Sequence, residues 1–135
     1  MIWLSPRNVM LGGVTLEHVS AVSLSRRAEK VVVEYGSGGP HVEFADVPER
    51  RVEIEITRTV VDQQDNGVRP GDAVALRFRT APSGAGLPVR EVTADVVITG
   101  VESKLSARGG AMQTVSCVAV SADGSADPVV EADVA

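Results

Sequence analysis

The sequence predicts an all-β, mainly antiparallel fold, either a β-sandwich or a small β-barrel with at most one short helix. The prediction depends on three segments in which apolar and polar residues alternate: Arg51–Val61, Ala73–Arg79 and Glu91–Thr99. Successive side chains of a strand point to opposite faces, so each segment has one apolar face to bury and one polar face for solvent. Strands of this kind are typical of antiparallel sheets that are solvated on one side.

The other expected elements are short strands separated by frequent turn signals. In chain order the expected strands are Val9–Leu11, Val14–Leu16, Val19–Leu24, Val31–Tyr35, His41–Phe44, Arg51–Val61, Ala73–Thr80, Glu91–Glu102 and Met112–Ser121. Gly12-Gly13 predicts a tight hairpin between the first two, because glycine adopts positive φ readily. The polar stretch Ser25–Lys30 indicates a turn. Ala45–Arg50 indicates one helical turn, with Pro48 where a first turn tolerates it.

The chain has 135 residues, enough for one domain with a single core. We expect an N-terminal arm over residues 1–8, a sandwich or barrel over residues 9–125 and a C-terminal arm over residues 126–135. Both ends carry apolar residues outside any alternating strand, which favours docking on a neighbouring molecule. For Trp3, folding back onto its own core is an equal alternative.

Composition excludes several kinds of site. Aromatic residues make up 3% of the chain, so aliphatic residues must fill the core. Phe44 and Phe78 lie at alternating positions that we expect to face the core. The net charge is −5 and lysine and arginine are not clustered, which disfavours a nucleic-acid-binding surface. Cys117 is the single cysteine, so no intrachain disulfide or multi-thiolate zinc site can form, and we expect it to be buried. No signal-peptide pattern or apolar run of roughly 20 residues is found.

Catalytic signatures are missing. His18 and His41 belong to no pattern such as HExxH, and no serine lies in a GxSxG elbow. The loop Asp62–Asp72 begins like a calcium-binding loop, but Ala73 stands where a bidentate glutamate is required. We therefore predict no enzymatic activity, no cofactor and no metal site.

Two stretches, GPHVEFADVPERRVEIEITR and ITGVESKLSARGGAMQTVSCVAVSADG, give the chain a family resemblance. Together with the chain length and β-rich layout, they resemble the tail tube proteins of tailed bacteriophages and phage-derived particles, which are related in fold to the tube protein of type VI secretion. They cover Gly39–Arg58 and Ile98–Gly124. Members of this family usually carry a helix against the sandwich, for which only Ala45–Arg50 is available here.

The resemblance implies a structural protein of the virion tail, assembled in the host cytoplasm without a membrane. Protomers would form homo-hexameric rings, and rings would stack into a tube through which DNA passes without sequence-specific binding. Sheath, baseplate or terminator proteins are the implied further partners. Two other functions remain possible from the sequence. One is a tail terminator or baseplate adaptor that forms a single ring. The other is a soluble β-sandwich binding module, which the scarcity of aromatic residues disfavours.

Two groups of residues are candidates for roles in such a tube. An acidic lumen would repel phosphate and let DNA slide, and the candidate lumen-facing residues are Glu53, Glu55, Glu91 and Asp95. Arg77 and Arg79 would neutralise that face, and if Arg51–Val61 paired with Ala73–Thr80, Glu55 would lie near Arg79. The candidate inter-ring contacts are Trp3, Asp62, Asp65, Asn66 and Arg69.

Overall fold

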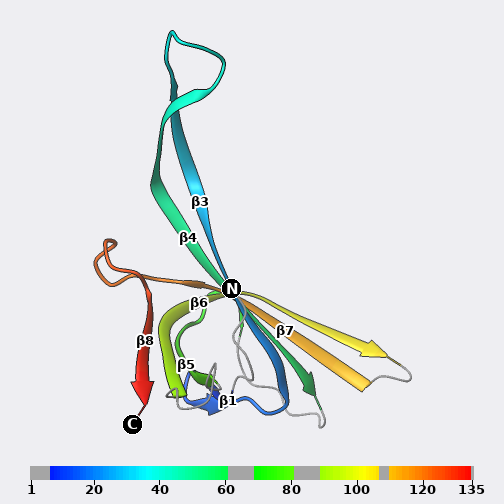
Figure 1. The fold of residues 1–135 in the computed structure, drawn as a ribbon. Helices are drawn as coiled ribbons and strands as arrows, with labels where there is room; N and C mark the ends of the chain where they lie inside the picture. The colour runs from blue at the N-terminus through cyan, green and yellow to red at the C-terminus, as the bar shows by residue number, and fades with distance from the viewer. Residues whose placement is uncertain (1–6, 61–68, 81–88, 107–109, 135) are drawn as a thin grey trace.

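The computed structural model describes residues 7–60, 69–80, 89–106 and 110–134 (Figure 1). These residues form strands and turns and contain no helix. The strands are β1 (Arg7–Leu11), β2 (Val14–Thr15), β3 (Val19–Tyr35), β4 (Val42–Val60), β5 (Ala73–Thr80), β6 (Val89–Ser106), β7 (Gly110–Ala119) and β8 (Val129–Val134). All of their pairings are antiparallel, so the predicted all-β antiparallel class is confirmed.

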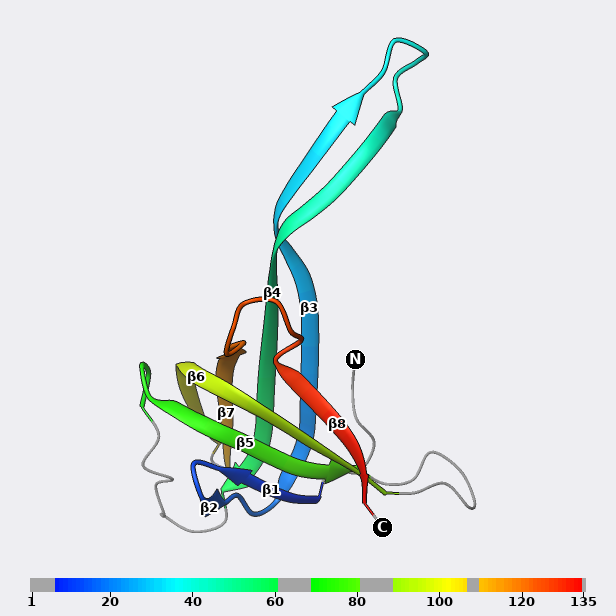
Figure 2. The same cartoon turned by 90° about the vertical axis from the view of Figure 1, so that its left-hand side faces the viewer.

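The strands belong to one curled sheet in the order β2-β1-β5-β6-β7-β4-β3, with β8 also paired to β6. The first half of β6 pairs with β5, and its second half pairs with β7. The register of β6 shifts between Ile98 and Gly100, and such a bulge bends a strand. β6 therefore passes from one layer to the other, and β5 and β1 lie across β3 and β4 (Figure 2). The end strands β2 and β3 do not pair, so the arrangement is sandwich-like and not a closed barrel.

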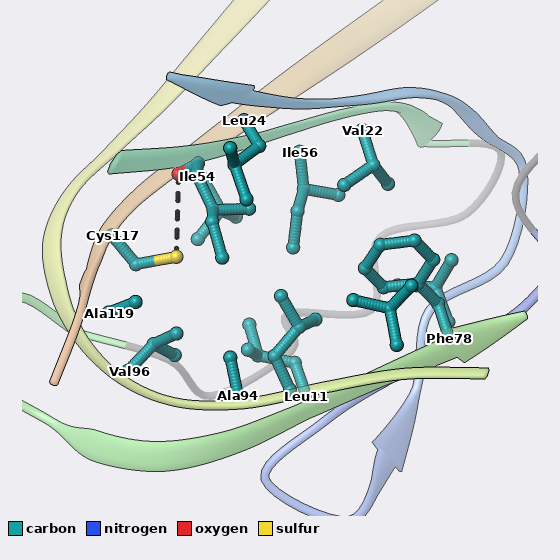
Figure 3. Packing of buried hydrophobic residues seen from close by; sticks show 14 of the residues in the cluster. Leu11, Val22, Leu24, Ile54, Ile56, Phe78, Ala94, Val96, Cys117 and Ala119 are labelled. Carbon is teal, nitrogen blue, oxygen red and sulfur yellow. Dashed lines mark hydrogen bonds between the residues drawn. The ribbon is translucent and has the colours of Figure 1, made fainter. Parts of the chain in front are cut away.

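One apolar core fills the space between the two layers. Ile54 and Ile56 reach into it from one side, and Ala94 and Val96 reach into it from the other (Figure 3). Phe78 is fully buried and is the aromatic residue of the cluster, as its parity predicted. Burying an aliphatic or aromatic side chain of this size stabilises a fold by roughly 1.5–3 kcal/mol, so the alternating residues of β4 and β6 hold the layers together.

Cys117 is buried in this core, as predicted. Its thiol donates a hydrogen bond to the carbonyl oxygen of Ile54, with a sulfur–oxygen distance of 3.4 Å (Figure 3). Burial raises the pKa of the Cys117 thiol to about 12. Because the thiolate is the reactive form, Cys117 acts as a small packing residue.

The strands β3 and β4 extend well beyond the two layers as a twisted two-stranded ribbon (Figures 1 and 2). We call residues 26–51 the arm. The neighbouring strand β7 pairs with β4 only from Glu53 onward, so within the described residues the arm strands pair only with each other.

The arm corrects two predictions. The expected turn at Ser25–Lys30 is part of β3, and the expected helical turn at Ala45–Arg50 is part of β4. A ribbon that is solvated on both faces needs no apolar–polar alternation, so its residues look like turn residues. Pro48 lies between the pairs Lys30↔Glu49 and Val32↔Asp46, where the register shifts. Proline is tolerated at such an irregularity because no ladder hydrogen bond is lost there.

The ends of the described chain also differ from expectation. The C-terminal segment is not an arm, because β8 pairs with the first half of β6 and buries Val129. At the other end, Arg7 and Asn8 already belong to β1, so the sheet begins within the expected N-terminal arm. The predicted hairpin at Gly12-Gly13 is confirmed, with φ values of 63° and 82°.

Candidate assembly surface

The outer part of the arm exposes apolar side chains to solvent. We call residues 31–46 the distal arm. Its exposed apolar side chains are Val31, Val32, Val33, Tyr35, Val42 and Phe44, of which Tyr35 is 64% and Phe44 52% exposed. The expectation that Phe44 lies in the core is therefore wrong. A two-stranded hairpin alone is at best marginally stable in water, and contiguous exposed apolar residues mark interaction surfaces.

The distal arm is also acidic. It carries Glu34, Glu43 and Asp46 and contains neither lysine nor arginine, which gives a net charge of −3 with His41 neutral. Cross-strand pairing places Glu34 opposite Phe44, and Tyr35 opposite Val42. Carboxylates and large apolar side chains are therefore neighbours on this ribbon.

Where the arm leaves the body, the surface is hollowed and basic. We call this the basal hollow: a depression of about 750 Å³ between the base of the arm and the turn that precedes β8. Its charged lining consists of Arg26, Arg27, Arg50, Arg51 and Asp127. Four arginines and one aspartate give this lining a net charge of +3. Apolar side chains, among them those of Val52, Val120 and Pro128, complete the walls.

Ion pairs fix most of these arginines in place. Arg26 lies 3.1 Å from the Asp127 carboxylate. Arg27 and Arg51 share one oxygen of Glu53, at 3.0 Å and 2.8 Å. Arg51 also lies 3.9 Å from a carboxylate oxygen of Glu29. Arg50 makes no ion pair within the described residues, so it is the arginine whose positive charge the basal hollow keeps uncompensated.

The turn that closes the basal hollow is organised by Asp123. Its carboxylate accepts hydrogen bonds from the backbone amides of Ser125 and Ala126 and from the hydroxyl of Ser121. The backbone hydrogen bonds from Ala126 and Ser125, followed by that from the Ser121 side chain, lower the pKa of Asp123 to about 2. The turn thereby places Asp127 beside Arg26.

The four candidate lumen-facing residues do not form one surface. Glu53 and Glu55 project from the outer side of β4, opposite the buried Ile54, whereas Glu91 and Asp95 project from the outer side of β6, opposite the buried Val96. The buried side chains Ile54 and Ile56 of β4 and Ala94 and Val96 of β6 point toward each other across the core (Figure 3). Because successive residues of a strand point to opposite faces, the two acidic pairs point away from one another. The structure therefore separates them into two acidic positions on opposite layers.

Two of these acids are neutralised by arginine: Glu53, which pairs with Arg27 and Arg51, and Glu91. Glu91 forms ion pairs with Arg77 and Arg79, and the hydrogen bond from Arg77, followed by the charges of both guanidinium groups, lowers the pKa of Glu91. The expected proximity of Glu55 and Arg79 is wrong, because β4 pairs with β3 and β7, and β5 pairs with β1 and β6. Glu55 and Asp95 are exposed and make no ion pair within the described part of the chain.

Among the candidate inter-ring contacts, the structure describes Arg69. It lies in an exposed turn before β5, where its backbone amide donates a hydrogen bond of 2.9 Å to Asp72, and the amide of Asp72 donates one of 3.1 Å to the Arg69 carbonyl. The other candidates lie outside the described residues: Trp3, Asp62, Asp65 and Asn66.

Two further kinds of site are not found in the described residues. They contain no group of three or more histidine, cysteine, aspartate or glutamate side chains that could hold a metal ion. They also contain no helix with the length and apolarity that a bilayer span requires.

Sequence reasoning missed the arm and the basal hollow, which are the most distinctive surfaces of this molecule. A signal for the arm was present: the stretch from Val19 to Tyr35 contains no glycine, proline or asparagine. Turns depend on these residue types, so an uninterrupted strand was the better interpretation of Ser25–Lys30. The hollow itself forms from segments distant in sequence, around Arg26, Arg50 and Asp127.

Comparison with known proteins assigns no family to the chain: no protein-family model matches it, and no curated protein matches its sequence.

Proposed function

We propose that this protein is a structural component of the tail of a phage or phage-like particle, which self-assembles into stacked hexameric rings that form a DNA-conducting tube. One observation carries the proposal: a compact β-body projects a long β-ribbon whose valine, tyrosine and phenylalanine side chains are exposed. Such a ribbon is stabilised when another molecule covers it. A subunit that repeats many times offers such a covering surface at every position.

The open edges of the curled sheet support the same proposal. Within the described residues, the outer edge of β3 and the outer edge of β8 carry no partner strand. Unpaired edges are templates for pairing with another chain. A ring of identical subunits removes this liability by closure.

Under this proposal, the outer face of β3, β4 and β7 is the better candidate for the lumen wall. Glu55 lies there directly opposite Ser23 on β3 and Ser116 on β7. Hydroxyl groups and an unneutralised carboxylate hold phosphate weakly, so DNA would slide past them. The outer face of the other layer presents Arg77 and Arg79, which attract phosphate.

The proposal is tested by negative-stain electron microscopy and light scattering of the purified protein over a range of concentrations and salts. We expect rings with six-fold symmetry that stack into tubes. Single rings that never stack would assign the protein a terminator or adaptor role instead. A protein that stays monomeric under all conditions would refute the proposal.

A further inference from the structure

We propose that the distal arm of one copy inserts into the basal hollow of a neighbouring copy, and that opposite charges select this contact. The inference rests on the proposed function in one respect, namely that copies of this chain meet one another. It adds which surface receives the arm and which residues decide the pairing.

Charge is the first argument. The distal arm has a net charge of −3, from Glu34, Glu43 and Asp46. The charged lining of the basal hollow has a net charge of +3. Glu53 and Glu29 pair with Arg27 and Arg51 from outside the lining, so a net charge of about +1 remains with these partners included, and Arg50 carries it. Carboxylates and guanidinium groups form hydrogen-bonded, often bidentate pairs, and complementary potentials select the correct partner and suppress wrong ones.

Apolar surface is the second argument. Tyr35, Val42 and Phe44 lie exposed among the carboxylates of the distal arm, and Val52, Val120 and Pro128 lie among the arginines of the hollow. At about 750 Å³ the hollow falls within the size range of pockets that enclose a compact ligand, roughly 300–1,000 Å³. It can therefore hold the tip of the ribbon but not its whole length.

Reach is the third argument, and it identifies the occupant as a second copy. The hollow begins at Arg26, and the tip of the arm follows Tyr35 on the same strand. A strand rises about 3.3 Å per residue, so the tip lies on the order of 30 Å from the hollow of its own chain. The extended ribbon in Figure 2 does not fold back on its base. An arm can therefore fill only the hollow of another molecule.

The resulting contact joins two different patches, so it is heterologous and runs head to tail. Such contacts form closed rings when the rotation between copies closes, and open filaments when it does not. One kind of contact repeated between copies is thus sufficient to propagate an assembly.

Charge reversal tests the pairing directly. In the tip variant, Glu34→Lys with Glu43→Lys changes the charge of the distal arm from −3 to about +1. In the hollow variant, Arg26→Glu with Arg50→Glu changes the lining from +3 to about −1. We expect each variant alone to need at least about tenfold more protein for half-maximal assembly, measured by light scattering.

Mixing the two variants provides the decisive observation. In an equimolar mixture, the basic arm of the tip variant meets the acidic hollow of the hollow variant, and the acidic arm of the latter meets the basic hollow of the former. Every contact of an alternating assembly is then complementary, so we expect assembly within about threefold of the wild-type concentration. Circular dichroism of each variant checks that the body remains folded.

A control variant carries Glu17→Lys and Glu102→Lys, which changes net charge as much as the tip variant but away from both surfaces. We expect it to assemble like the wild type. The inference is overturned if the tip and hollow variants assemble normally, or if their mixture assembles no better than either variant alone. In either case the proposed function still holds, provided that the wild type forms rings. If the wild type forms only head-to-tail dimers or chains that both variants abolish, the inference stands and the tube function falls.

Discussion

The two phenylalanines of this chain offer a matched pair for testing the separation into body and arm. Phe78 is 0% exposed in the core, and Phe44 is 52% exposed on the arm. Both residues nevertheless lie at positions where the alternation of the sequence predicts a side chain that faces the core. Replacing a buried phenylalanine by alanine costs roughly 3–5 kcal/mol. The contacts of Phe44 are cross-strand neighbours such as Glu34, which contribute roughly 0.2–1 kcal/mol each.

We therefore expect Phe78→Ala to lower the free energy of unfolding by about 3–5 kcal/mol, and Phe44→Ala by about 1 kcal/mol or less. With a urea slope of about 2 kcal/mol/M, the unfolding midpoint shifts by roughly 1.5–2.5 M for Phe78→Ala and by about 0.5 M or less for Phe44→Ala.

The assay is urea denaturation followed by circular dichroism, at a protein concentration where light scattering shows monomers, because assembly would add its own stabilisation. If Phe78→Ala does not fold, Phe78→Leu provides a milder variant whose midpoint should still fall below that of Phe44→Ala. Equal losses at the two positions would refute the assignment of Phe44 to a solvated ribbon.

Two further predictions concern titrating side chains. Because burial raises the pKa of Cys117 to about 12, we expect this thiol to resist thiol reagents in the folded protein at mildly alkaline pH and to react fully in urea; rapid reaction without denaturant would contradict its burial. Asp123 has a folded-state pKa of about 2, below the usual 3.8, so its stabilising effect is complete above pH 3.8 and is lost as pH falls towards 2. The urea midpoints of wild type and Asp123→Asn should accordingly differ at neutral pH and converge in acid, whereas a difference independent of pH would exclude the carboxylate as its cause.

The sequence predicted the parts of the fold in which one face of a strand is buried. Ile54, Ile56 and Val96 alternate with polar residues because the curled sheet has a core on one side only. The same reasoning failed for the arm, since both faces of that ribbon are solvated and burial imposes no period. Phe44 shows the failure most clearly, because its parity matches that of the core residues further along β4, yet no second layer covers it.

The candidate site could be predicted only in part. The acidic character of Glu55 and Asp95 was visible in the sequence, but their separation onto opposite layers depends on the bend of β6, which no local pattern indicates. The basal hollow depends on the pairing of Arg26 with Val52 and on the return of the chain to β8, both of which are long-range contacts. Propensity and alternation act within a segment and do not determine such contacts.

The central claim is that the arm serves assembly and not folding. Between Leu24 on β3 and Val52 on β4, no described residue belongs to the buried core. The most direct test replaces residues 29–49 by an Asn-Gly turn, which joins the opposed residues Ala28 and Arg50. The replacement removes Val47 and Pro48 from the wall of the basal hollow but keeps its whole charged lining.

Analytical ultracentrifugation then compares this variant with the full chain, and urea denaturation checks its stability. The account predicts that the full chain assembles, and that the variant is a monomer whose body unfolds at the same urea concentration as the full chain in its monomeric state. A variant that assembles as the full chain does, or one whose body no longer folds, would contradict it.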